Sequence, residues 1–66
     1  MTQYEIRFKE SPKILQIDLM SYFLTYEMVE EIIKTNEPSL TNLDWELYKK
    51  DKQGKFYLDK DSSEIE

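Results

Sequence analysis

The sequence predicts an α+β domain in which one amphipathic helix covers one face of a four-stranded, mainly antiparallel sheet. Three observations support this fold class. Apolar and polar residues alternate near the start of the chain, apolar residues recur at helical spacing between Tyr22 and Ile33, and the single glycine, Gly54, separates two further alternating runs. A chain of 66 residues has room for one core. The expected order is strand, strand, helix, strand, strand (ββαββ).

The first strand is predicted where three apolar residues alternate with three charged ones. Tyr4, Ile6 and Phe8 alternate with Glu5, Arg7 and Lys9. A period of two is typical of a strand with one face on a core and the other in water. Ser11-Pro12 then predicts a turn, because proline's fixed φ suits the second turn position.

The segment 13–20 has two interpretations. Leu15, Ile17 and Leu19 alternate with Gln16 and Asp18, which favours a second strand. The alternative is a long helix that begins at Ser11-Pro12 and gives a βαββ order. Apolar residues would then point all around that helix, and a small protein has nowhere to bury such a surface. We therefore prefer the strand.

A helix is predicted from Tyr22, because apolar and charged residues separate onto two sides at 100° per residue. The apolar side carries Tyr22, Tyr26, Met28, Val29, Ile32 and Ile33, and the other side carries Glu27, Glu30, Glu31 and Lys34. Ser21 or Asp18 is the expected N-cap, Asn36 is expected to end the helix in the left-handed conformation, and Pro38 prevents continuation.

The last predicted unit is a hairpin whose inward residues are Trp45 and Leu47 on one strand and Phe56 and Leu58 on the other. Gly54 lies where a type I turn followed by a bulge needs positive φ. The sheet face away from the helix should then carry Glu5, Arg7, Lys9, Gln16, Asp18, Glu46, Tyr48, Lys50, Tyr57 and Asp59. The domain is expected to span 1–58, and 59–66 to be an acidic, disordered tail.

Charge is unevenly distributed along the chain. The net charge is −5, from 14 acidic and 9 basic residues. The segment from Asp18 to Glu46 contains seven carboxylates and a single basic residue, Lys34. The segment just after it contains one acidic residue, Asp51, and four lysines: Lys49, Lys50, Lys52 and Lys55. The predicted domain therefore has an acidic part and a basic hairpin.

The side chains that most catalysis needs are absent. The chain contains no histidine and no cysteine, which removes the commonest general base, the thiolate nucleophile and the commonest transition-metal ligands. A single glycine cannot form a phosphate-binding loop. We therefore expect a protein that is not an enzyme and that binds no metal or cofactor. With no signal-peptide pattern or long apolar run, the expected location is the cytoplasm, without membrane insertion.

The leading functional hypothesis is a small acidic binding protein that occupies the basic surface of a nucleic-acid-binding protein. Carboxylates spaced along a helix and adjoining segments imitate the charge density of a phosphate backbone. The predicted acidic array is Glu27, Glu30, Glu31, Glu37, Asp44 and Glu46. In size, acidity and aromatic content the chain is similar to the small DNA-mimic inhibitors made by phages, which would act in the host cytoplasm.

Two other hypotheses use different surfaces. The first is an accessory protein that forms a homodimer without mimicry, through a sheet edge or through an aromatic face containing Tyr48 and Tyr57, because so small a core has no disulfide to support it. The second is weak binding of single-stranded nucleic acid by the lysine hairpin, whose aromatic residues would stack on bases. Direct binding of DNA is otherwise not expected from an acidic protein.

Overall fold

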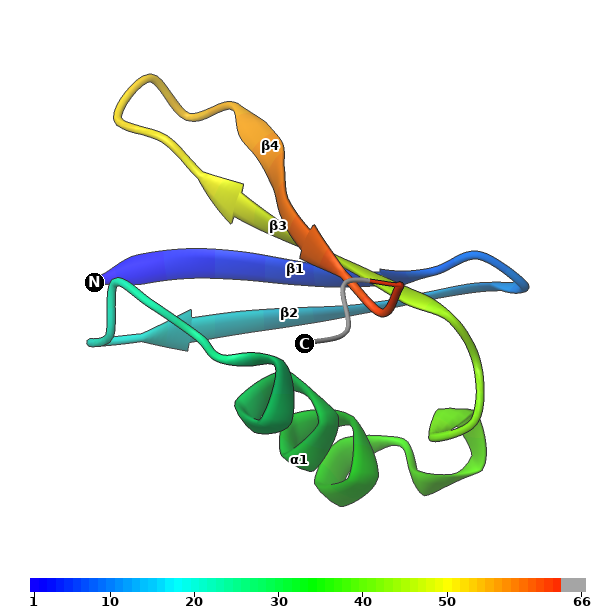
Figure 1. Cartoon of the computed structure of the whole chain (residues 1–66). Coiled ribbons are helices and arrows are strands. Elements are labelled where there is room, and N and C mark those ends of the chain that lie inside the picture. The colour runs from blue at the N-terminus through cyan, green and yellow to red at the C-terminus, as the bar shows by residue number, and fades with distance from the viewer. Residues whose placement is uncertain (64–66) are drawn as a thin grey trace.

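The computed structural model describes residues 1–63 of the chain. Their elements are β1 (Thr2–Phe8), β2 (Ser11–Leu19), α1 (Tyr26–Asn36), a 3-10 helix η1 (Pro38–Leu40), β3 (Trp45–Lys50) and β4 (Phe56–Asp61). The four strands form one antiparallel sheet in the order β2-β1-β3-β4, and α1 lies against one face (Figure 1). The predicted α+β class and ββαββ order are confirmed, and the segment 13–20 is a strand as far as Leu19.

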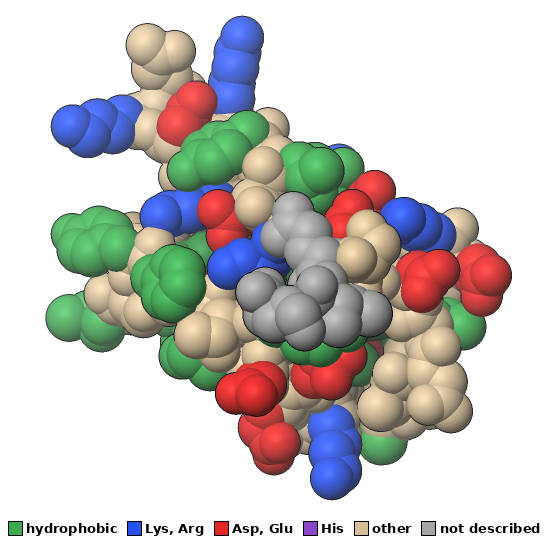
Figure 2. Space-filling model, viewed as in Figure 1, with side chains coloured by type: hydrophobic (Ala, Val, Ile, Leu, Met, Phe, Trp, Pro, Cys, Tyr) green, Lys and Arg blue, Asp and Glu red, His purple; other side chains and the backbone are tan. Residues whose placement is uncertain are grey.

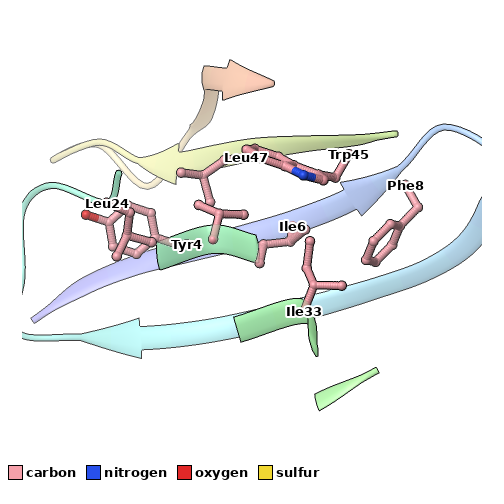
Figure 3. Close-up of a cluster of buried hydrophobic side chains, with 8 residues drawn as sticks. Tyr4, Ile6, Phe8, Leu24, Ile33, Trp45 and Leu47 are labelled. Atoms are coloured by element: carbon pink, nitrogen blue, oxygen red, sulfur yellow. The ribbon is translucent and has the colours of Figure 1, made fainter. Parts of the chain in front are cut away.

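The core lies between α1 and the two central strands. β1 and β3 contribute Tyr4, Ile6, Phe8, Trp45 and Leu47, while Leu24, Val29 and Ile33 come from α1 and the residues before it. Figure 3 shows these side chains converging on one layer between the helix and the sheet. Because these apolar residues alternate along β1 and β3 with residues of the other face, they form one row of contacts for the helix.

The first turn differs from the prediction. Lys9 and Glu10 form the turn, and Ser11 and Pro12 already belong to β2. The Ser11 hydroxyl oxygen accepts a hydrogen bond from the Lys13 N–H at 3.2 Å. This local bond accompanies a register irregularity between Arg7 and Phe8, which lets the chain reverse two residues earlier than the proline suggested.

The helix is confirmed, but its ends were predicted wrongly. It begins at Tyr26 rather than Tyr22, and the N-cap is Thr25, whose hydroxyl accepts from the Met28 N–H at 3.1 Å. Tyr22 and Leu24 lie in the loop before the helix, where their carbonyl oxygens accept from the ammonium groups of Lys49 and Lys60. Asn36 is the last helical residue and does not take positive φ; its side-chain amide donates to the Ile32 carbonyl instead.

A β-bulge in β4 overturns the predicted faces of the second hairpin. Leu47 lies opposite Lys60, but the next residue, Tyr48, lies opposite Leu58, so Asp59 is an extra residue in β4. Lys60 therefore shares the helix side of the sheet with Leu47, and its ammonium donates to the Leu24 carbonyl at 2.6 Å.

The bulge moves three residues to the other face relative to the prediction. Phe56 and Leu58 lie on the face away from the helix rather than in the core, and Tyr57 lies on the helix side. Of the other residues predicted for the outer face, Glu5 pairs with Gln16 and with Tyr48 as expected. Lys9 instead lies in the first turn, and Asp59 is the extra residue of the bulge.

Gly54 occupies the predicted position in the turn, with φ of 85°. The Asp51 side chain holds this turn together by accepting from the N–H groups of Gln53 and Lys55, each at 2.9 Å. Beyond the turn, β4 continues to Asp61, three residues past the predicted domain boundary. Residues 64–66 of the predicted tail lie outside the described residues.

Candidate functional site

The acidic side of α1 is the strongest candidate surface. Val29 and Ile33 point into the core and are at most 1% exposed, which turns Glu27, Glu30 and Glu31 toward solvent. None of these three carboxylates forms an ion pair within residues 1–63. The solvent side of the helix thus carries three negative charges without an ion-pair partner in this part of the chain, and the packing of the other side holds the helix in place.

Asp44 belongs to the same surface, although it precedes β3. Partial burial raises the pKa of the Tyr26 phenol, and the negative charges of Glu30 and Asp44 raise it further, which places both carboxylates near this ring. Tyr26 itself packs on Trp45, with 5.2 Å between ring centroids. The aromatic pair therefore fixes the first turn of the helix beside the start of β3.

Two members of the predicted array lie elsewhere. Glu37 follows the last turn of the helix and forms an ion pair with Lys13 at 3.1 Å, so its charge is compensated. Glu46 is on the opposite face of the sheet, where its carboxylate accepts from the Tyr48 hydroxyl at 3.2 Å. The structure brings together Glu27, Glu30, Glu31 and Asp44, which we call the acidic surface; Lys34 is the basic residue on the same helix.

The predicted aromatic pair does not share a face. Tyr48 lies on the outer face, where the Arg7 guanidinium stacks 3.9 Å from its ring centroid and also pairs with Glu5 at 2.6 Å. Tyr57 lies opposite Lys49 on the helix side and is 45% exposed. The expectation of a joint Tyr48–Tyr57 face is wrong, because the bulge reversed the side to which Tyr57 points.

Basic residues gather at the other end of the molecule. Lys52 and Lys55 are exposed in the β3–β4 turn, and Lys50 lies 5.7 Å from the centroid of the Phe56 ring. Figure 2 shows basic side chains projecting at the upper left over this turn, and acidic side chains at the bottom over α1, with a basic side chain projecting beside them. The charge separation predicted along the sequence is therefore also a separation in space.

An exposed apolar loop was missed by sequence reasoning. Met20, Tyr22 and Phe23 are 79%, 77% and 63% exposed, and apolar side chains project at the left of Figure 2, where the β2–α1 loop lies in Figure 1. Tyr4 donates to the Ser21 carbonyl at 3.0 Å and Lys49 to the Tyr22 carbonyl at 2.5 Å, so the loop backbone is held. The available signal was the apolar run Tyr22-Phe23-Leu24, which was assigned to the helix instead.

A shallow apolar groove of about 300 Å³ lies between α1 and the edge strand β2. Its lining residues are Leu19, Leu24, Met28, Glu31, Ile32, Thr35 and Asn36. On the β2 side, Leu15 and Ile17 continue the same apolar row and are only partly buried. This groove was not predicted, because sequence periodicity does not show which inward-facing residues the helix leaves uncovered.

Residues 1–63 contain no cluster of acidic side chains arranged to hold a metal ion. No helix in this part of the chain has the length and apolar character needed to cross a membrane. Comparisons with protein-family models, with curated proteins and with solved structures give no match to the chain.

Proposed function

We propose that the protein binds a basic, nucleic-acid-binding protein through the acidic surface and thereby competes with nucleic acid. The observation that carries this proposal is the set of uncompensated carboxylates on a helix whose other side is locked into the core. Glu27 to Glu31 spans about 6 Å of helix axis and carries three charges, or one per about 2 Å. Double-stranded DNA carries one charge per about 1.7 Å, counting both strands.

Rigidity supports the same proposal. The backbone that carries these carboxylates is already ordered before the partner binds, so the conformational entropy lost on binding is confined to the glutamate side chains. The net charge of −5 steers a basic partner toward the molecule, and the distant lysine turn gives the approach a preferred orientation. Such a protein would act as an inhibitor by occupancy, without chemistry.

The test is affinity capture from a bacterial lysate at low salt, followed by elution with a double-stranded oligonucleotide. We expect captured proteins to be displaced by the oligonucleotide and to be retained less by the triple variant Glu27→Gln, Glu30→Gln, Glu31→Gln, whose net charge is −5 + 3 = −2. Retention should also fall as salt rises.

A second triple variant provides the matched control. Glu10→Gln, Asp18→Asn and Glu46→Gln produce the same net charge of −2 but leave the helix unchanged. This control should retain the captured proteins more strongly than the helix variant does. Equal losses in the two variants, or capture that neither salt nor the oligonucleotide affects, would contradict the proposal.

A second candidate function is the binding of single-stranded nucleic acid at the basic end. It is favoured by one observation: Tyr22 and Tyr57, both exposed, lie on the side where Lys49 bonds the Tyr22 carbonyl. Exposed aromatic rings beside lysines can stack on bases while the ammonium groups contact phosphates. Titration of a labelled single-stranded oligonucleotide at low salt tests it, and an unchanged anisotropy would eliminate this candidate.

A further inference from the structure

The two edges of the sheet are protected to different degrees. β4 forms one edge and carries the bulge at Asp59 together with Lys60 and Asp61, which are features that prevent pairing with another strand. β2 forms the other edge and is the longest strand, with regular pairing from Leu19 to Ile14. Within that stretch only Asp18 is charged, and there is neither proline nor bulge. An edge of this kind is a template for another strand.

The groove beside β2 extends the unprotected edge toward the helix. Apolar surface is partly exposed along this side of the domain. It comes from Leu15, Ile17 and Leu19 in β2 and from Met28 and Ile32 in α1. A partner that supplied a strand alone would pair with the edge but leave the helix side open. The occupant must therefore bring both a strand and an apolar helix side.

We propose that this occupant is a second copy of the chain, with β2 pairing antiparallel to the partner's β2. Two-fold symmetry matches a surface to itself, so each strand edge meets a strand edge and each groove meets the other helix. Because the symmetry axis is normal to the sheet, both helices lie on the same face of one continuous sheet. This dimer does not depend on the function proposed above.

The pattern of β2 selects a register with the two-fold axis at Ile17. Leu15 then lies opposite the partner's Leu19, and Ile17 lies opposite the partner's Ile17, so apolar residues face one another on the helix side. On the outer face, Gln16 lies opposite the partner's Asp18, and no like charges are directly opposed. The same register brings Ile14, which is 47% exposed, toward the partner's Met20, which is 79% exposed.

The neighbouring registers match less well. An axis at Leu15 places Lys13 opposite the partner's Ile17, and an axis at Gln16 places Ile14 opposite the partner's Asp18. Each of these pairs a charge with an apolar side chain.

The size of the interface sets the expected strength. With the axis at Ile17, residues 14–20 of the two copies overlap, and seven residues at about 3.3 Å each give a paired length of about 23 Å; a sheet with one helix layer is about 20 Å thick. The wall is therefore about 460 Å² on each copy, which is in the range of weak, transient interfaces. We expect a dimer that forms at high protein concentration and dissociates on dilution.

Sedimentation equilibrium of the unmodified protein is the first test. The mass should rise from 8.0 kDa toward twice that value as the concentration increases into the high micromolar range. A monomeric mass throughout this range would overturn the proposal.

Cysteine cross-linking tests the register, and the chain contains no cysteine of its own. In Ile17→Cys the two thiols face each other, because opposed residues in antiparallel strands have Cα atoms about 4.5–5.5 Å apart, within disulfide range. In Leu15→Cys the two thiols are about 13 Å apart along the strands. Under mild oxidation we expect a covalent dimer for Ile17→Cys and little for Leu15→Cys or for Lys55→Cys in the distant turn. Linking at residue 15 or 55 as fast as at residue 17 would overturn the proposed pairing.

Discussion

Replacing Ile33 with alanine should be among the most destabilising changes in the helix. Ile33 is 1% exposed and packs with Val29 and Leu24 against the inward residues of β1 and β3. The helix has no disulfide or metal to hold it to the sheet, so this contact supplies much of its attachment. Alanine keeps the helical propensity and removes only the packed side chain.

The magnitude follows from the atoms removed. Isoleucine to alanine deletes three carbon atoms, worth about 0.8 kcal/mol each when fully buried, or about 2.4 kcal/mol in total. A residual cavity of about 50 Å³ adds about 1.2 kcal/mol at about 24 cal/mol per Å³. The expected loss is therefore about 2.5–3.6 kcal/mol. A core of this size supplies about 3–5 kcal/mol, so the variant should be close to unfolding.

Ile32→Ala is the matched control, because it deletes the same three carbons one residue earlier on the helix. Ile32 is only partly buried and lines the groove beside β2, so its loss should be about 1 kcal/mol. Urea unfolding at one low protein concentration, followed by the fluorescence of Trp45, which is buried and the only tryptophan, gives both free energies. Equal losses in the two variants would refute the assignment of Ile33 to the core.

Two further predictions concern the second turn and a buried phenol. Gly54→Val should lower the free energy of unfolding by about 1 kcal/mol or more, and Gly54→Asn by less, because asparagine tolerates positive φ and valine does not; equal urea midpoints would contradict the turn geometry. Burial, and then the charge of Asp59, raises the pKa of the Tyr4 phenol above 10.0. The unfolded chain therefore releases this proton at lower pH than the folded chain does, and stability should fall as pH rises above about 10. Tyr4→Phe should lose less stability than the unmodified protein between about pH 9 and pH 11, and parallel losses would count against it.

The elements that were predicted correctly depend on local pattern. Alternation in β1 and β3 identifies the inward residues, because any strand with that pattern buries the same side. The turn at Gly54 needs only one residue with positive φ. These features follow from neighbours within a few residues, which sequence reasoning can use.

The errors arose where a distant residue decides the local structure. The helix starts at Tyr26, after the N-cap Thr25, and the ammonium groups of Lys49 and Lys60 bind carbonyls of the loop before it. The same Lys60 can reach Leu24 only if β4 contains the bulge, and that bulge moved Tyr57 to the other face. Neither contact is visible from periodicity, so the aromatic face was misplaced together with the start of the helix.

The candidate site shows the same division. Glu27, Glu30 and Glu31 were predicted to lie together because helical spacing alone brings them onto one side. Glu37 and Glu46 were grouped with them by sequence proximity, although a distant lysine pairs with Glu37 and the sheet separates Glu46 from the helix. Counting charges along the sequence therefore overestimates the number of carboxylates that lie together in the folded protein.

Salt should act with opposite sign on the two proposed interactions, which allows them to be tested separately. The contact with a basic protein joins opposite charges, so screening weakens it. The dimer joins two molecules that each carry −5, and it brings Glu31 of each groove toward the other helix, so screening should strengthen it. Raising salt should therefore release captured proteins while the sedimenting mass increases. If capture fails but the mass still doubles, the acidic surface is not the binding site and the β2 edge remains an interface.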